Sequence, residues 1–398
     1  MNRVVIVGAS AGGLATAEAL RRQGYGNTIT LVGDEPRLPY DRPPLSKQLL
    51  AGQWTPGRLA LRPEADVDAL GLELRLGVPA AGLDTARQAV TLADGTTVDY
   101  DALVVATGVR ARRLPDTDGV AGVHTLRTLP DALALKERLR PGRHLVIVGA
   151  GFVGAEVAAT ARGLGVRVTL LESGPVPLAL AVGEEAGQFL TSLHHEHDVT
   201  IHTGAAVTEI LRTSGGLAVR LADGTVVLAD DVLVAIGSVP NTEWLADSGL
   251  TIHNGLMCDE YCAAAPGVYG VGDVACWRNT LFHTWMRIEH RTNAAEQGMA
   301  VARNLLNPEA RKPFAPVPYF WSDQYDIKIQ AYGHLHDHDE ALVLDADLPG
   351  RQLLVAYRKA DRLIGVLAVG KSPKILRAWR ALIAAATPWA AAITTTAA

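Results

Sequence analysis

Two apolar runs, residues 4–7 and 145–148, each lead into a turn of small residues, then a helix and a second apolar run. In the second copy the helix is followed by the run 166–171, and in the first copy by the run 29–32. On one side of the second helix, at helical spacing, are Val153, Val157, Ala161 and Leu164. We expect that side to pack on the sheet. The pattern predicts two strand–turn–helix–strand units with parallel strands.

The turn of the second copy contains the full GxGxxG motif, with glycines at Gly149, Gly151 and Gly154. The first glycine permits the tight turn, the second lets a pyrophosphate approach the start of the helix, and the third allows close helix–strand packing. Glu172 ends the second strand, about 20 residues on, where a carboxylate accepts hydrogen bonds from an adenine ribose. Because this carboxylate would repel a 2′-phosphate, the unit is predicted to prefer NAD to NADP.

The first copy departs from the motif at one position. Its turn contains Gly8, Gly12 and Gly13, but Ser10 stands where the second glycine is expected. A side chain must therefore fit beside the pyrophosphate, with its hydroxyl available as a hydrogen-bond donor. Asp34 and Glu35 both follow the second strand, and we treat them jointly as the ribose-binding acids.

The repeat extends beyond the two cradles. Each is followed by a hairpin with an Asp-Gly turn, at 94–95 and 223–224, and by a buried strand, 102–106 or 232–236, that ends at a glycine. The chain is therefore predicted to hold two dinucleotides, and electrons are expected to pass from one to the other.

Three further segments are candidates for the site. The proline-rich residues 38–50 predict a stiff loop, with a helix beginning at Ser46 and Lys47 and the lysine near the first nucleotide. Asp273 follows the short strand that starts at Val268 and is either a ligand of a ribityl chain or a turn aspartate. Asn293, with Glu296 three residues on, predicts the capped start of a helix whose positive end faces an electron-rich ring.

From about residue 315 a run of strands, including 341–344, 353–357 and 363–369, predicts a small α+β domain without a phosphate loop. A helix with Ser372 as cap and Pro373 at its first position closes this domain. Its expected apolar side contains Ile375, Leu376, Trp379, Leu382 and Ile383, and the opposite side contains Lys371, Lys374, Arg377 and Arg380. This basic stripe is either a docking surface or an ordinary solvated face.

Composition narrows the function classes. With 48% apolar and 20% charged residues the chain is typical of globular proteins, and a net charge of −5 argues against nucleic-acid binding. Met1 leads directly into the first strand, so no leader is expected, and the protein is predicted to be cytoplasmic, with no membrane association. The uncharged, alanine-rich residues 381–398 are expected to form a disordered end.

Cysteine and histidine positions bear on the chemistry. No cysteine precedes Cys258, so the redox-active thiol of a disulfide reductase is missing, and Cys258 and Cys262 are expected to be ordinary buried residues. The segment 334–339, HLHDHD, is interpreted as a polar hairpin edge in preference to a ligand cluster. No metal site is predicted.

Taken together, the motifs VIVGAS, PYDRPPLSK, ATG, VGAGFVGAE, AIGSVPN, VGDV, RIEH and FWSDQY resemble a known family. It is that of the FAD-dependent, NADH-oxidising ferredoxin reductases of oxygenase and cytochrome P450 systems, and the resemblance covers nearly the whole chain. It implies a glutathione-reductase-like fold of two tandem Rossmann-like dinucleotide-binding domains, plus a small C-terminal α+β domain. The implied domains are an FAD-binding domain in two parts, 1–114 and 243–314, an NAD-binding domain, 115–242, and a C-terminal domain, 315–398.

The resemblance also implies roles for individual residues. Lys47 and Glu156 would be catalytic, beside the flavin and the nicotinamide. The residues expected to bind FAD are Gly8, Ser10, Ala11, Gly12, Gly13, Asp34, Glu35, Arg42, Lys47, Ala80, Thr107, Gly108, Arg127, Gly272, Asp273, Glu289, His290, Arg291 and Trp321. Those expected to bind NAD are Gly149, Gly151, Phe152, Val153, Gly154, Glu156, Glu172, Ile236 and Gly237. Trp321 belongs to the FWSDQ segment, which is expected to be a loop, and Arg291 replaces the tryptophan or aliphatic residue of relatives.

The implied function is electron transfer from NADH through FAD to a small acidic ferredoxin with a [2Fe-2S] or [3Fe-4S] cluster, bound transiently. The ferredoxin would serve a cytochrome P450 or a Rieske oxygenase, and the reductase would be a monomer or a weak homodimer. Two alternatives stay open. One is a rubredoxin reductase, a monodehydroascorbate-type reductase or an NADH oxidase of the same fold. The other is a flavoprotein that signals in response to NADH, as apoptosis-inducing factor does.

Overall fold

The computed structural model describes residues 1–396, which form two compact units, each made of several chain segments. The first unit contains Met1–Asp41, Gly57–Arg110 and Val239–Pro318, and the second contains Arg42–Pro56, Ala111–Ser238 and Tyr319–Ala398. The short strands β8 (Val109–Ala111) and β17 (Ser238–Pro240) lie where the chain passes from one unit to the other. The finer four-part division expected from the sequence stays a prediction.

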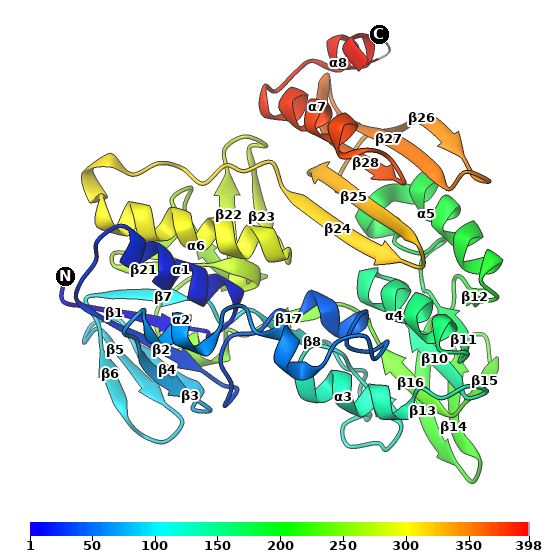
Figure 1. The fold of residues 1–398 in the computed structure, drawn as a ribbon, viewed down its shortest axis with the longest axis horizontal. Helices are drawn as coiled ribbons and strands as arrows, with labels where there is room; N and C mark the ends of the chain where they lie inside the picture. The colour runs from blue at the N-terminus through cyan, green and yellow to red at the C-terminus, as the bar shows by residue number, and fades with distance from the viewer. Residues whose placement is uncertain (397–398) are drawn as a thin grey trace. The chain divides into compact units, whose positions relative to one another are not determined.

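A six-stranded sheet forms the centre of the first unit, with strand order β20-β21-β7-β1-β2-β3. Its strands are β1 (Arg3–Val7), β2 (Thr28–Gly33), β3 (Glu73–Leu76), β7 (Ala102–Val105), β20 (Ala263–Ala265) and β21 (Val268–Gly270). Helices α1 (Ala11–Arg22) and α6 (Arg291–Leu306) lie side by side on one face (Figure 1). The other elements are β4 (Ala80–Asp84), β5 (Ala89–Leu92), β6 (Thr97–Asp99), β18 (Ile252–His253), β19 (Gly255–Cys258), β22 (Ala275–Asn279), β23 (Thr284–Arg287) and α2 (Glu64–Asp68).

The second unit has a five-stranded parallel sheet of order β12-β11-β10-β16-β9. Its strands are β9 (Val123–His124), β10 (His144–Val148), β11 (Arg167–Leu171), β12 (Thr200–His202) and β16 (Asp231–Val234). The accompanying elements are α3 (Leu129–Arg138), α4 (Phe152–Gly163), α5 (Ala179–Glu196), β13 (Val207–Thr213), β14 (Gly216–Leu221) and β15 (Val226–Ala229).

An antiparallel sheet of order β24-β25-β28-β27-β26 also belongs to the second unit. Its strands are β24 (Tyr319–Gln324), β25 (Ile327–Gly333), β26 (Glu340–Asp347), β27 (Gln352–Lys359) and β28 (Arg362–Val369). Helices α7 (Pro373–Ala384) and α8 (Trp389–Thr396) follow, and α7 packs on β28 and β25 through Leu376, Trp379 and Ile383. The predicted small α+β domain is confirmed.

The tandem repeat is confirmed by strand register. β1 lies between β2 and β7, and β10 lies between β11 and β16, all in parallel. Both Asp-Gly hairpins form, as β5–β6 and β14–β15. The two cradles therefore have the same local architecture, and the predicted fold class is correct.

Three expectations about local structure near the site are wrong. Val153, expected in the core, is 41% exposed, because it lies in the first turn of α4, where the helix has only just left the glycine turn. The proline-rich segment forms a 3₁₀ helix, Pro43–Ser46, that ends before Lys47, since the fixed φ of proline suits the first turn of a helix. The FWSDQ segment is not a loop but most of β24.

Two helix ends also differ from expectation. His290, in an extended conformation, is the N-cap of α6, so the helix starts at Arg291, and Asn293 is a buried helical residue rather than the cap. The alanine-rich end is not disordered within the described residues, since α8 forms there with Ala392 fully buried. Alanine is the strongest helix former, which explains this helix. No helix among residues 1–396 is long and apolar enough to cross a membrane.

Candidate functional site

The first cradle is built by glycines that could not be replaced. Gly8 has φ +125°, and a Cβ on it would lie 2.0 Å from the carbonyl oxygen of Ala106. A Cβ on Gly13 would lie 1.9 Å from the carbonyl oxygen of Gly8. Because these neighbours are backbone atoms, they cannot move aside, and β1, β7 and α1 meet at this distance only around glycine.

The second cradle repeats these contacts. A Cβ on Gly149 would lie 2.4 Å from the carbonyl oxygen of Ala235, and one on Gly154 would lie 2.1 Å from that of Gly149. Gly151 differs, because a Cβ there would meet no described atom within 4 Å. Gly151 therefore leaves open space beside the start of α4, as the predicted pyrophosphate position requires, and Ser10 occupies the equivalent position before α1.

Both cradle helices present uncompensated positive ends. Neither α1 nor α4 has an acidic residue in its first turn, and neither N-cap residue, Ser10 or Gly151, makes a side-chain capping bond. The first backbone N–H groups of a helix have no partners within the helix, so these groups are free to meet an anion. The residues present fit the diphosphate of a dinucleotide in both cradles.

The acidic residues differ between the cradles. The Glu172 carboxylate accepts hydrogen bonds from the backbone N–H groups of Ala150 (2.8 Å) and Gly174 (2.7 Å), which hold it at the glycine turn. By strand register the equivalent of Glu172 in the first cradle is Gly33, so the acids there come later in the chain. Glu35 accepts a bond from the Tyr40 hydroxyl at 2.8 Å, whereas Asp34 is exposed. Their joint role at a ribose stays a prediction.

Lys47 and Glu156, the two predicted catalytic residues, form an ion pair within the second unit. Lys47 Nζ lies 2.7 Å from Glu156 Oε2, and their side chains are only 11% and 8% exposed. Two serines complete the surroundings of the carboxylate: Ser46 donates to Oε2, and Ser322 donates to Oε1 at 2.8 Å. The sequence analysis assigned no role to either serine, because hydroxyl groups that bond a distant carboxylate leave no local pattern.

The other residues predicted to bind FAD are divided between the two units. Arg42, Lys47, Arg127 and Trp321 belong to the second unit, where Arg42 Nη1 donates to the Arg127 carbonyl at 2.8 Å. Those in the first unit are Gly8, Ser10, Ala11, Gly12, Gly13, Asp34, Glu35, Ala80, Thr107, Gly108, Gly272, Asp273, Glu289, His290 and Arg291. All the predicted NAD residues belong to the second unit.

Within the first unit, several of these residues are held by partners that sequence reasoning missed. Asn241 donates to the Thr107 carbonyl at 2.9 Å, while the Thr107 hydroxyl donates to the Asn241 carbonyl at 2.8 Å. Gln297, from α6, accepts the backbone N–H of Gly272 at 2.8 Å. Arg291 pairs with Asp41 at 2.6 Å, so the positive charge at this unusual position has a carboxylate beside it.

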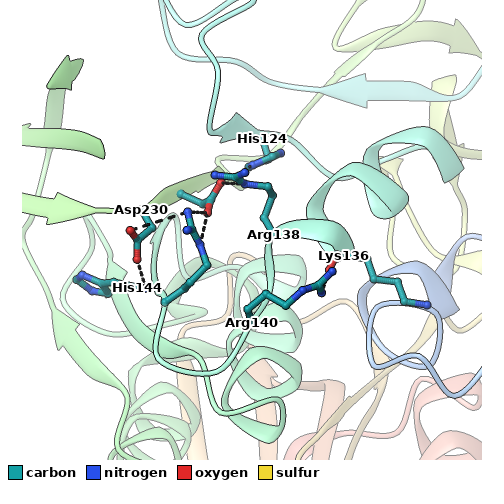
Figure 2. Close-up of polar contacts among 8 residues, drawn as sticks. His124, Lys136, Arg138, Arg140, His144 and Asp230 are labelled. Atoms are coloured by element: carbon teal, nitrogen blue, oxygen red, sulfur yellow. Dashed lines mark hydrogen bonds and ion pairs between the residues drawn. The ribbon is translucent and has the colours of Figure 1, made fainter. Parts of the chain in front are cut away.

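Asp231 is the centre of a charged cluster whose members are scattered along the sequence and form no motif. Its side chain, 3% exposed, accepts hydrogen bonds from Arg138 at 2.8 Å and Arg143 at 2.9 Å, and lies 3.2 Å from His124 Nε2. Figure 2 labels two of these partners, Arg138 and His124. Asp231 pairs with Leu145 at the start of the parallel strands, whereas Gly149 follows their carboxyl ends. The cluster therefore stabilises the sheet at the end opposite the cradle.

Replacing Asp231 with asparagine is expected to lower the free energy of unfolding by about 2 kcal/mol, because charge-assisted bonds at a buried position are lost. Burial raises the pKa of Asp231, but hydrogen bonds from His124, Arg138 and Arg143 outweigh it and hold the pKa below its ordinary value. The ionised Asp231 carboxylate therefore contributes to the free energy of unfolding above its unfolded-state pKa of about 3.9, and this contribution is lost as the pH falls through the lower pKa of the folded state.

Urea unfolding at neutral pH measures the effect. Asp118→Asn, at an 83% exposed carboxylate, is the control and should change stability little. Equal effects of the two variants would contradict the role of the cluster.

Two of the three cysteines, Cys258 and Cys262, are buried thiols. Cys258 and Cys262 are 2% and 0% exposed, and Gln297 donates to the Cys262 sulfur at 3.3 Å. Burial raises the pKa of Cys262 to about 12 and the pKa of Cys258 well above its ordinary value. Neither thiol ionises near neutral pH, as nucleophilic redox chemistry would require. The expectation of ordinary buried cysteines is confirmed.

The basic stripe is smaller than expected. Lys371 lies before α7, and its ammonium bonds Asp345 and Gln352, so its side chain is only 9% exposed and does not belong to the stripe. Lys374, Arg377 and Arg380 are exposed on α7. Ile375, expected on the apolar side, is 37% exposed. Within residues 1–396 no group of three or more histidine, cysteine or acidic side chains is arranged to hold a metal ion.

Comparison with known proteins identifies the chain's relatives. Residues 2–298 match the family model described as pyridine nucleotide-disulphide oxidoreductase, and residues 319–397 match the reductase C-terminal model. Rhodocoxin reductase of Rhodococcus erythropolis is 37% identical, with 97% of this chain and 90% of that protein covered. The ferredoxin–NAD(+) reductase component of the p-cumate 2,3-dioxygenase system of Pseudomonas putida is 39% identical, with 84% and 81% covered.

A solved structure gives the same answer. The crystal structure of the covalent putidaredoxin reductase–putidaredoxin complex matches with a TM-score of 0.93 at 33% identity, covering 100% of this chain and 99% of that one. This structural match includes both glycine cradles and the C-terminal domain. The chain therefore belongs to the pyridine nucleotide-disulphide oxidoreductase family, among its ferredoxin–NAD(+) reductases.

Proposed function

We propose that this protein passes electrons from NADH, through FAD, to a small iron–sulfur ferredoxin that serves a cytochrome P450 or a Rieske oxygenase. The observation that carries the proposal is the pair of glycine cradles, each with an uncapped helix end and with two glycines that have no room for a side chain. The buried thiols support electron transfer without sulfur chemistry in the reductase. Putidaredoxin reductase, of the same fold, was solved in a covalent complex with putidaredoxin.

FAD would be held by the cradle of the first unit, with its diphosphate at the start of α1 and its ribose near Asp34 and Glu35. NADH would be held by the second cradle, with its diphosphate at the start of α4 and its adenine ribose on Glu172. FAD, once bound, would supply the chemistry that links a two-electron hydride donor to a one-electron iron–sulfur acceptor. The protein contributes binding, alignment and exclusion of water.

Lys47 and Glu156 would orient the reacting groups. The carboxylate is fixed by Lys47, Ser46 and Ser322, so it presents a constant position to a bound nicotinamide carboxamide. Within this pair, the ammonium group of Lys47 is the hydrogen-bond donor and the Glu156 carboxylate is the acceptor. The amino end of α6, with no acidic residue in its first turn, would favour negative charge on a reduced flavin ring.

The test of this function is the absorbance of the purified protein with and without NADH under nitrogen. We expect a yellow protein that NADH bleaches and that a ferredoxin then reoxidises. Parallel assays with rubredoxin, monodehydroascorbate and oxygen distinguish the reductases and oxidases of the same fold. Negligible turnover with every acceptor, together with NAD-dependent dimerisation, would instead favour a signalling flavoprotein.

We further propose that Lys374, Arg377 and Arg380 on α7 attract an acidic ferredoxin with a [2Fe-2S] or [3Fe-4S] cluster. All three are exposed on one short helix, and electrostatic attraction chiefly raises association rates. The ferredoxin would bind transiently to a monomer or a weak homodimer. The free thiols are those that a reducing cytoplasm would leave, which is where we place the protein.

Reversing charge at Lys374 and Arg377 to glutamate should lower the ferredoxin-coupled rate roughly tenfold at low salt, because long-range steering is lost. Ferricyanide reduction by NADH should be unaffected, since that small acceptor needs no docking surface. A double reversal at the exposed Arg87 and Arg212, with the same change in net charge, is the matched control. If it lowers the coupled rate as much, only the net charge of the protein matters.

A further inference from the structure

Glu156 lies at one end of a row of buried polar side chains. Its Oε2 bonds Lys47 and Ser46, and its Oε1 accepts a hydrogen bond from Ser322 at 2.8 Å. Ser322 and Gln324 alternate with Asp323 along β24, so both face the same side, and both are fully buried. Gln324 Nε2 donates a hydrogen bond to Ser322 Oγ at 3.3 Å. The Ser322 hydroxyl therefore accepts from Gln324 and donates its own proton to Glu156.

The next two atoms in this row are buried polar atoms of Gln324 and His194. Gln324 Oε1, an acceptor, and His194 Nε2, a possible donor, both have no hydrogen-bond partner among the described residues. The Gln324 side chain lies near enough to His194 to raise the pKa of the ring, against the larger lowering by burial. An unpaired buried polar atom costs about 1–3 kcal/mol, so satisfying both atoms with one bond is strongly favoured.

The other ring nitrogen of His194 determines its tautomer. His194 Nδ1 lies 2.7 Å from the Tyr325 hydroxyl, and the His194 side chain, on α5, is fully buried. Burial, with His197 and His195 nearby, lowers the pKa of His194 to about 4, so the ring is neutral at neutral pH. A neutral ring has one N–H group, and placing it on Nε2 lets Nδ1 accept from the Tyr325 hydroxyl.

We propose that Tyr325, His194, Gln324 and Ser322 form a one-way chain of hydrogen-bond donors that ends on the Glu156 carboxylate and positions the Glu156–Lys47 pair for NADH oxidation. Each donor points toward Glu156, so the negative charge strengthens every bond in the chain. The hydrogen-bond chain joins α4 and α5 to β24, which lies far from both helices in the sequence. The four members are positioning residues, because they act through Glu156, and their kinetic role rests on the function proposed above.

The first test detects the chain of hydrogen bonds directly and does not depend on enzyme activity. Nitrogen-15 NMR of the histidine rings at neutral pH, with His194→Gln used for assignment, should show His194 with its proton on Nε2. Gln324→Leu, of similar size, should shift the His194 Nε2 signal strongly, whereas His195→Gln, at the exposed neighbour on the same helix, should not. A proton on Nδ1, or no response to Gln324→Leu, would overturn the proposal.

The second test uses two variants that each delete one hydroxyl group. Ser322→Ala, next to Glu156, should slow the limiting rate at which NADH bleaches the flavin roughly tenfold, and Tyr325→Phe, at the far end, about twofold. NADH affinity should change by less than about twofold, because the cradle glycines and Glu172 are untouched. If the two variants lose rate equally, and in proportion to their loss of thermal stability, the residues have only a structural role. If NADH does not bleach the flavin of the wild-type protein, the proposed function is wrong. The NMR result would then still decide whether the chain of hydrogen bonds exists.

Discussion

Replacing Gly154 with alanine is expected to weaken NADH binding at least about a hundredfold while leaving FAD bound. The added Cβ would lie 2.1 Å from the carbonyl oxygen of Gly149, far inside contact distance. Both overlapping groups are held by the backbone of α4 and of the glycine turn, so the helix start must move away from β10. Because the backbone cannot move to relieve this overlap, the overpacking costs about 3 kcal/mol. That energy corresponds to roughly a hundredfold increase in the dissociation constant for NADH. Titration of the purified yellow protein with NAD measures it.

Gly163→Ala is the matched control in the same helix. A Cβ at Gly163 would meet no described atom within 4 Å, and alanine is the better helix former by up to about 1 kcal/mol. This variant should bind NADH normally and be at least as stable as the wild type. Equal binding by both variants would mean that the second cradle does not hold NADH. Loss of flavin from Gly154→Ala would show that the effect is not confined to that cradle.

Replacing Glu172 with arginine is expected to shift the preference between NADH and NADPH by roughly a thousandfold. The variant loses a charged acceptor for the adenine ribose and gains a cation for a 2′-phosphate, each worth about 1.5–3 kcal/mol. Together these changes amount to about 4 kcal/mol in the ratio of kcat/KM values, or roughly three powers of ten. Steady-state kinetics with both coenzymes and ferricyanide provide the measurement.

The control for this prediction separates local from overall charge. Glu209→Arg changes the net charge equally at a carboxylate that is 47% exposed on β13. It should leave the coenzyme ratio unchanged, since screening weakens interactions between distant surface charges. A wild-type preference for NADPH would contradict the assignment of Glu172 to the ribose.

Local sequence patterns were sufficient for the two cradles. Gly8 and Gly13, or Gly149 and Gly154, reveal a close approach of backbone segments because no other residue has the required space. The same holds for the Asp-Gly hairpins and, apart from the exposed Ile375, for the apolar side of α7, since turn chemistry and helical spacing depend on neighbours in the chain. Local rules failed at the start of α6, where the cap is His290 and not Asn293.

Contacts between distant residues, in contrast, could not be derived from any local pattern. Lys47 and Glu156 are 109 positions apart, and Ser322 and Glu156 are 166 apart, yet each pair is within hydrogen-bonding distance. Resemblance to a family pointed to Lys47 and Glu156 but not to Ser322, His194 or the partners of Asp231. The physical reason is that backbone geometry is restricted by adjacent residues and leaves a periodic trace in the sequence. A buried charge, however, is satisfied by whichever polar groups the folded chain brings to it, and their spacing carries no regular signal.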